Sequence, residues 1–186
     1  MTGEQAVVAV IDALEAAGVP YMVVGSLSSN LYGIPRSTHD ADIVVQLAPE
    51  RLSELRKLLA PPFRWEPQMS FETVTGTTRQ ILEAPGGVFK IELFFLTDDP
   101  HDQARFARRV PVAVLGRQAY AASAEDVVIT KLRWSKQGQR HKDVDDVRAV
   151  LTVSGAMLDW DYIHRWCDAH GTRALLDEIR RTIPQI

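Results

Sequence analysis

Two aspartates separated by a single residue are the groups most able to do chemistry. Asp40 and Asp42 lead into an apolar run at residues 43–45. Side chains two apart on a strand point to the same face, so both carboxylates would project together while Ala41 points away. Adjacent carboxylates repel each other unless a cation lies between them, and hard divalent ions such as Mg²⁺ prefer oxygen ligands. The pair therefore predicts a site for a divalent cation.

A glycine–serine pair precedes these acids by thirteen residues. Gly25 and Ser26 end an apolar run at residues 21–24, at a point where a helix would begin. Glycine lets another group approach the backbone closely, and the first N–H groups of a helix attract a phosphate. Residues 21–47 therefore predict a strand, a tight turn, a short helix, a loop and a second strand.

A third carboxylate lies inside the most apolar run of the chain. Residues 88–96 (VFKIELFFL) predict an interior strand with Lys90, Glu92 and Phe94 on one face. A carboxylate in such a strand is costly to bury without a partner. Glu92 either pairs with Lys90 or an arginine, or serves as a third metal ligand. We favour the metal role, because acids without an evident partner in core strands mark functional sites.

The ordered set of apolar strand, Gly25-Ser26, thirteen-residue spacer and Asp40-x-Asp42 resembles the signature of the polymerase-β-type nucleotidyltransferases. Arg36 and Thr38 also resemble residues that its small prokaryotic branches carry before the carboxylates. The resemblance implies an α/β (α+β) fold, with a mixed β-sheet core flanked by helices. It implies transfer of a nucleoside monophosphate from a nucleoside triphosphate (NTP) to a hydroxyl. It assigns catalysis and the binding of Mg²⁺ or Mn²⁺ to Asp40, Asp42 and Glu92, and nucleotide binding to Gly25, Ser26, Arg36 and Thr38.

Downstream residues resemble the motifs of one branch, the AbiEii-type toxins of abortive-infection and toxin–antitoxin systems. Those toxins carry a lysine on one helix and a basic-Asp-x-x-Asp run on the next. Here the lysine is Lys131 and the last acid is Asp146, with Arg140 or Lys142 as the basic position. The resemblance implies that Lys131 neutralises triphosphate charge and that Asp146 orients Lys131 or meets the nucleotide. Solvent-facing ion pairs are the alternative interpretation of this spacing.

The resemblance leaves the acceptor open. A toxin of this branch would add nucleotides to a tRNA end and have a cognate antitoxin as partner. An antitoxin-type relative would adenylylate a protein hydroxyl and have a cognate toxin as partner, and a drug-resistance relative would modify an antibiotic. We favour the toxin-like branch. A catalytically silent module that keeps the nucleotide pocket is the alternative from a different functional class.

Composition limits the possible classes of protein. The chain has 186 residues and a net charge of −3, which argues against a non-specific nucleic-acid coat. Cys167 is the only cysteine, so no disulfide forms within the chain, as suits a reducing cytoplasm. No apolar run reaches the ~18 residues of a membrane span, and no signal peptide is evident. We expect a cytoplasmic protein without a membrane partner.

The elements that position the acids follow from periodicity and turn residues. Predicted helices cover residues 4–17, 27–32, 49–60, about 98–109, 123–137, 141–153, 158–169 and 172–183. Predicted strands cover 19–24, 41–47, 71–74, 80–84, 88–96, 110–115 and 118–122. Acids at 98–102 are expected to start a helix rather than to bind a metal. A composition shift near Ser123 predicts a nucleotidyltransferase core at 1–122 and a helical region at 123–186.

Overall fold

The computed structural model describes residues 1–59, 61–73, 76–138 and 141–183. The helices are α1 (Gly3–Ala16), α2 (Gly25–Tyr32), α3 (Leu52–Leu58), α4 (Pro100–Ala107), α5 (Ala124–Gly138), α6 (His141–Ser154), α7 (Trp160–His170) and α8 (Arg173–Arg181), with 3-10 turns at Pro49–Arg51 and Gly155–Met157. The strands are β1 (Tyr21–Val24), β2 (Asp40–Val45), β3 (Arg64–Trp65), β4 (Ser70–Glu72), β5 (Thr77–Glu83), β6 (Lys90–Phe95), β7 (Val110–Val114) and β8 (Arg117–Ala121).

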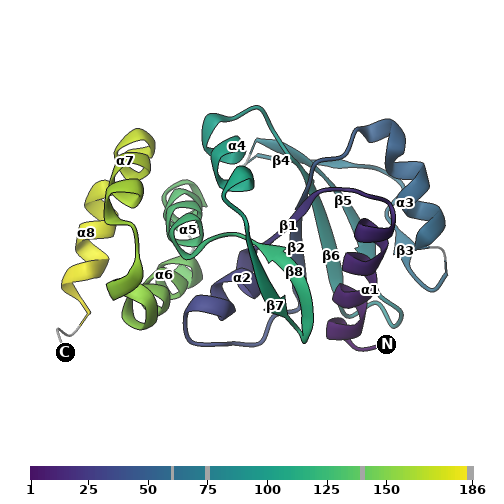
Figure 1. Ribbon diagram of the computed structural model, residues 1–186, viewed down its shortest axis with the longest axis horizontal. Coiled ribbons are helices and arrows are strands. Elements are labelled where there is room, and N and C mark those ends of the chain that lie inside the picture. Colours follow the sequence, from purple (N-terminus) through teal and green to yellow (C-terminus); the bar gives the residue numbers. More distant parts are fainter. Residues whose placement is uncertain (60, 74–75, 139–140, 184–186) are drawn as a thin grey trace.

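A single mixed sheet connects these strands in the order β3-β5-β6-β2-β1-β8-β7, and β4 pairs with β5 outside this path. Strand β1 is antiparallel to β2, and β2 is parallel to β6. The C-terminal helices α5–α8 gather at one end of the molecule, whereas α1 and α3 lie toward the other (Figure 1). This architecture confirms the predicted α/β class with a mixed sheet, and it places β6 in the sheet interior as predicted.

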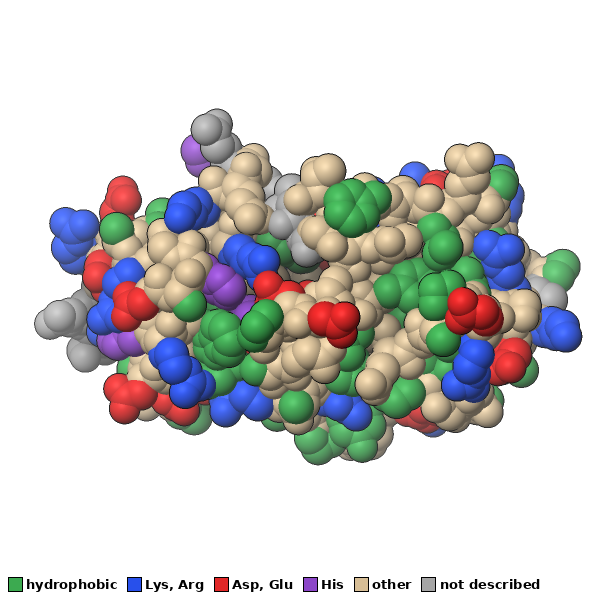
Figure 2. Space-filling view, turned by 90° about the horizontal axis from the view of Figure 1, so that it is seen from above, with side chains coloured by type: hydrophobic (Ala, Val, Ile, Leu, Met, Phe, Trp, Pro, Cys, Tyr) green, Lys and Arg blue, Asp and Glu red, His purple; other side chains and the backbone are tan. Residues whose placement is uncertain are grey.

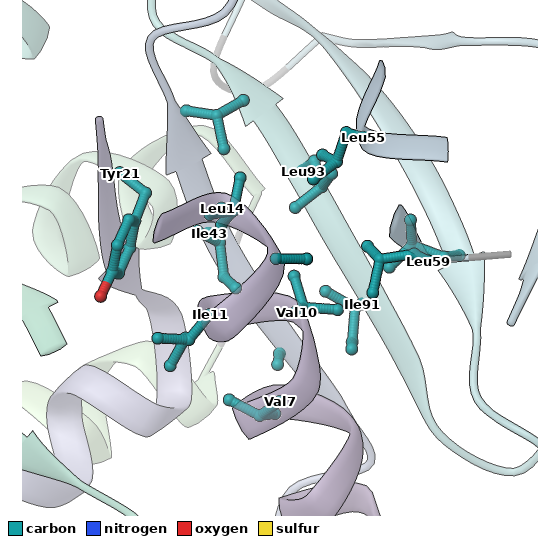
Figure 3. Close-up of a cluster of buried hydrophobic side chains, with 14 of the residues drawn as sticks. Val7, Val10, Ile11, Leu14, Tyr21, Ile43, Leu55, Leu59, Ile91 and Leu93 are labelled. Atoms are coloured by element: carbon teal, nitrogen blue, oxygen red, sulfur yellow. The ribbon is translucent and has the colours of Figure 1, made fainter. Parts of the chain in front are cut away.

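One face of the sheet is covered by α1 and α3. Four residues on the apolar stripe of α1, Val7, Val10, Ile11 and Leu14, are fully buried against the sheet. They pack on alternate strand residues that include Ile43, Ile91 and Leu93 (Figure 3). Alternation along β2 and β6 turns these apolar side chains toward α1, and so turns the intervening acids to the opposite face.

The opposite face is covered only in part. Met22, Val24, Val44 and Phe94 belong to a second buried cluster with side chains of α5, α6, α7 and α8. The helices therefore cover β2 and β6 at Val44 and Phe94, two residues after Asp42 and Glu92. Asp40 and Glu92, near the starts of β2 and β6, lie on this same face but do not belong to the buried cluster under the helices.

The starts of α4 and α5 agree with the expectations from the sequence. Asp99 caps α4, because its side chain accepts hydrogen bonds from the backbone N–H groups of His101 and Asp102. Ser123 precedes α5, and its Oγ accepts from the backbone N–H of Asp126. The acids at 98–102 thus begin a helix, as predicted. Gly171, at φ +63°, separates α7 from α8.

The short strands differ most from the expectations. Strand β3 has two residues and was not predicted, and β5 begins at Thr77 rather than at residue 80. Both differences follow from pairing: β3 and β4 exist only as partners of β5, which no local pattern announces. Ala60 and Val74, the predicted ends of a helix and a strand, lie outside the described residues. Within the described ranges, no helix has both the length and the apolar character needed to cross a bilayer.

Candidate active site

The glycine–serine turn lies where β1 ends and α2 begins. Gly25 has φ +65°, and a Cβ built on it would lie 2.0 Å from Oδ2 of Asp42. Only glycine fits this position, because it tolerates the left-handed backbone and leaves room for the carboxylate. The Asp42 side chain therefore lies against the first residue of α2, beside N–H groups that the helix itself leaves without partners.

Strand register brings the second and third predicted acids together. Asp42 of β2 is the direct neighbour of Glu92 on the parallel strand β6, and Val24 faces Asp42 from β1. Paired residues on neighbouring strands turn their side chains to the same face. The structure thus places Asp42 and Glu92 side by side, with the Gly25 turn adjacent. Asp40 lies two residues earlier on that same face, opposite Lys90.

Glu92 has an arginine partner. Arg79 of β5 donates from Nη1 to Oε2 of Glu92 at 2.5 Å and from Nε to Ser70 at 3.2 Å. Burial raises the pKa of Glu92 above its ordinary value; Arg79 opposes this, and the negative charge of Asp40 adds to it. Glu92 therefore has the arginine partner that the first of its two interpretations required. The sequence alone could not identify Arg79 as this partner, because the contact depends on how β5 pairs with β6.

Asp40 is held by a neighbouring hydroxyl. Thr38 donates from Oγ1 to Oδ1 of Asp40 at 2.6 Å and also contacts the Asp40 carbonyl at 3.2 Å. Thr38, which is predicted to bind nucleotide, orients the first acid in this structure. This contact fixes the direction in which the Asp40 carboxylate leaves the start of β2.

Four of the predicted nucleotide-binding residues lie in one network. Arg36 donates from Nη2 to Oγ of Ser26 at 2.9 Å, and from Nε and Nη2 to the two oxygens of Asp146 at 2.8 and 2.9 Å. The ammonium of Lys131 lies 2.9 Å from Asp146 and 2.9 Å from Asp143. Asp146 therefore contacts Lys131, one of the two roles expected for it.

Charges in this network compensate one another. Burial would raise the pKa of Asp146, but hydrogen bonds from Arg36 and Lys131 outweigh it and hold that pKa below its ordinary value. The bond to Asp146 likewise raises the pKa of the Arg36 guanidinium. Lys131 is buried between two aspartates, whereas a surface ion pair would leave it in solvent. Of the two basic positions left open by the sequence, Lys142 is exposed and Arg140 lies outside the described residues.

The donor set suits a hard divalent cation, although the described side chains do not form a finished metal cluster. Among the described residues, no three His, Cys, Asp or Glu side chains stand in ligating geometry. Asp40 is turned toward Thr38 and Glu92 toward Arg79. The three carboxylates share one face of β2 and β6, and hard divalent ions prefer such oxygen ligands. A cation there would be held by carboxylate oxygens of Asp40, Asp42 and Glu92.

Surface charge is mixed on one face of the molecule. On the face shown in Figure 2, Lys and Arg side chains are interspersed with Asp and Glu, and neither sign forms an extended patch. Strand register gives the same result beside the acids. A row across β2, β6, β5 and β3 alternates in sign and consists of Asp40, Lys90, Glu83 and Arg64.

Comparison with known proteins finds likeness in structure. No protein-family model matches the chain, and no curated protein matches it significantly. The crystal structure of ANT(2")-Ia in complex with adenylyl-2"-tobramycin has a TM-score of 0.64 at 15% identity, covering 94% of this chain and 99% of that one. ANT(2")-Ia is an antibiotic-resistance factor.

Two further solved structures agree. An antigenic nucleotidyltransferase-like protein from Paracoccidioides brasiliensis has a TM-score of 0.59 at 15% identity, covering 99% of this chain and 94% of that one. The lincosamide antibiotic adenylyltransferase LnuA, with lincomycin bound, has a TM-score of 0.55 at 16% identity, covering 83% and 98%. The chain therefore has the nucleotidyltransferase fold, as the resemblance of its motifs implied.

Proposed function

We propose that this protein is a nucleotidyltransferase that uses Mg²⁺ or Mn²⁺ to transfer a nucleoside monophosphate from an NTP to a hydroxyl of a small molecule. One observation carries the proposal: strand register sets Asp42 beside Glu92, directly against the Gly25-Ser26 turn. Carboxylates next to a helix start give a metal-binding and a phosphate-binding surface on adjacent elements. The nucleotidyltransferase fold agrees with this chemistry.

Each group has a role in the reaction. The acceptor oxygen attacks the α-phosphorus of the NTP. The bond between the α-phosphorus and the oxygen that bridges to the β-phosphorus breaks, and pyrophosphate leaves. Glu92 accepts the proton of the acceptor hydroxyl, while Ser26 and the first N–H groups of α2 hold the outer phosphates. When bound, the divalent ion supplies charge neutralisation at the phosphates and lowers the pKa of a coordinated hydroxyl.

A small acceptor is favoured over RNA by three features. The match to an enzyme crystallised with an adenylylated antibiotic spans nearly the whole of both chains. The net charge is −3, and the row from Asp40 to Arg64 is neutral overall. A polyanion such as tRNA is bound mainly through excess Lys and Arg, which these features do not supply. The tRNA acceptor, the protein acceptor, the toxin role and the AbiEii-like branch stay predictions.

Label transfer tests the proposal. The full-length protein is incubated with Mg²⁺, each NTP labelled at the α-phosphate, and in separate reactions aminoglycosides, lincosamides, total tRNA or a cell lysate. We expect pyrophosphate release together with label in a small molecule. Label in tRNA or in a protein would show that this macromolecule, and not a small molecule, is the acceptor. Nucleotide binding without pyrophosphate release under any condition would identify a silent module and overturn the proposal.

An isosteric variant separates catalysis from folding. Asp42→Asn should reduce turnover by roughly 10²-fold or more, because electrostatic groups at reacting phosphates have effects of this size. Its melting temperature should hold or rise, since one of two repelling carboxylates is gone. Asp12→Asn, an exposed carboxylate on α1 paired with Arg117, is the matched control and should keep full turnover. A sharply lower melting temperature for Asp42→Asn would make Asp42 structural.

A further inference from the structure

A chain of alternating charges runs from the buried helical region to the glycine–serine turn. Asp143 on α6 has a fully buried side chain, Lys131 is 3% exposed, Asp146 is 7% exposed and Arg36 is 37% exposed. Each member contacts the next at 2.8–2.9 Å. Of these four residues, only Arg36 has a substantially exposed side chain, and it lies beside Ser26.

Lys131 is badly placed to meet a nucleotide itself. Its ammonium is buried, and both of its carboxylate partners are buried too. Moving it toward a phosphate would break two buried ion pairs, to Asp143 and to Asp146, which is strongly unfavourable. Lys131 therefore holds Asp146 in place, and Arg36 is the member of the network that is exposed enough to contact a ligand.

Arg36 has unused donors on its exposed edge. Its Nε and Nη2 groups are engaged by Asp146 and Ser26. Nη1 has, among the described residues, only a long contact of 3.5 Å to the Ser37 carbonyl. A guanidinium fixed along one edge presents the other edge at low entropic cost, and phosphate oxygens are its preferred partners.

The backbone of Arg36 is fixed as well. Asn30, on the last turn of α2, donates from Nδ2 to the Arg36 carbonyl at 2.7 Å. Its Oδ1 accepts from the Arg36 N–H at 3.1 Å. One amide side chain thus holds both polar groups of this loop residue. The motifs of the sequence gave no indication of a role for Asn30.

We propose that Arg36 is the cation that meets the NTP phosphates, and that Asn30, Asp146 and Lys131 act on the nucleotide only through Arg36, as positioning residues. The proposal rests on the proposed function, since it concerns the same NTP. It makes the helical region contribute to nucleotide affinity through a single side chain. Lys131 then has an indirect role in place of the direct phosphate contact that the sequence implied.

Double-variant cycles test this dependence. The dissociation constant of Mg²⁺–NTP is measured by calorimetry, and KM and kcat are measured where turnover exists. Asn30→Ala and Asp146→Asn should each weaken NTP binding about tenfold with little change in kcat, and Arg36→Gln more than either. Arg36→Lys, which keeps the charge and loses the fork, should fall between Arg36→Gln and the wild type.

The decisive comparison is made in the Arg36→Gln background. There, Asn30→Ala and Asp146→Asn should have no further effect on NTP affinity. Equal effects with and without Arg36 would show independent or general structural roles and overturn the proposal. The matched control is Arg117→Gln, another carboxylate-bound arginine, 43% exposed and paired with Asp12 and Glu15; it should bind NTP normally. Because binding is the readout, an enzyme without turnover would refute the proposed function without deciding this inference.

Discussion

At the scale of single residues, the site depends on side chains whose partners come from other strands. The spacing of Asp40 and Asp42 predicted that these two share one face, and strand register confirms it. Glu92 was grouped with them by the family resemblance, and the register places it on the same face. The sequence could not assign Arg79 to Glu92, because that contact depends on how β5 pairs with β6. Nor could it show that Lys131 is buried, since its spacing fits a surface helix equally well.

Gly25 gives a prediction at this scale. Gly25→Ala should lower the free energy of unfolding by roughly 1–3 kcal/mol and abolish turnover, because the new methyl group strains the backbone and displaces the Asp42 carboxylate. Gly18→Ala is the matched control: φ is +61° there, and nothing lies within 4 Å of the added Cβ. Chemical denaturation of both variants measures the difference. An equal loss of stability in the two would mean that the close approach of Asp42 to Gly25 has no energetic effect.

At the scale of elements, periodicity predicted the long helices well and the short strands poorly. The apolar stripe of α1 and the break at Gly171 are local signals, and both are confirmed. Strands of two or three residues carry no period of their own, so β3 and β4 follow only from their partner β5. Contacts between helices are equally non-local, and α7 provides a case with a measurable consequence.

His170 at the end of α7 packs on Trp166 and His101. Its Nε2 is buried without a partner among the described residues. Burial, helped by electrostatic interactions with His101 and Arg133, lowers the pKa of His170 to about 4, while Asp99 and Asp102 oppose the shift. The folded protein therefore favours the neutral ring, whereas the unfolded chain takes up a proton near the ordinary pKa of 6.5.

Stability should therefore depend on pH through His170. This contribution to the free energy of unfolding is intact above pH 6.5 and decreases as pH falls toward about 4. His170→Gln should therefore lose less stability than the wild type between pH 7 and pH 5. Urea denaturation at both pH values measures this. A wild-type slope retained in the variant would show that His170 does not titrate in this way.

At the scale of the whole molecule, two apolar layers cover opposite faces of one sheet, and the acids lie where the second layer stops. The α1 layer packs against one face of β2 and β6. The helices α5–α8 cover the other face only over Met22, Val24, Val44 and Phe94. The sequence predicted a sheet-based part and a helical part, with a boundary at 122/123 that stays a prediction. It could not predict that Arg36 and Asp146 join the two parts beside the site, because these residues are 110 positions apart.

The most direct test of the central claim is where a cation and a nucleotide bind. Crystals of the protein with Mn²⁺ and a non-hydrolysable NTP allow manganese to be located by its anomalous scattering. We predict manganese between the carboxylates of Asp40 and Asp42, with the outer phosphates at the Gly25-Ser26 turn. Manganese and nucleotide bound away from these carboxylates, or no binding at millimolar concentrations, would contradict the account.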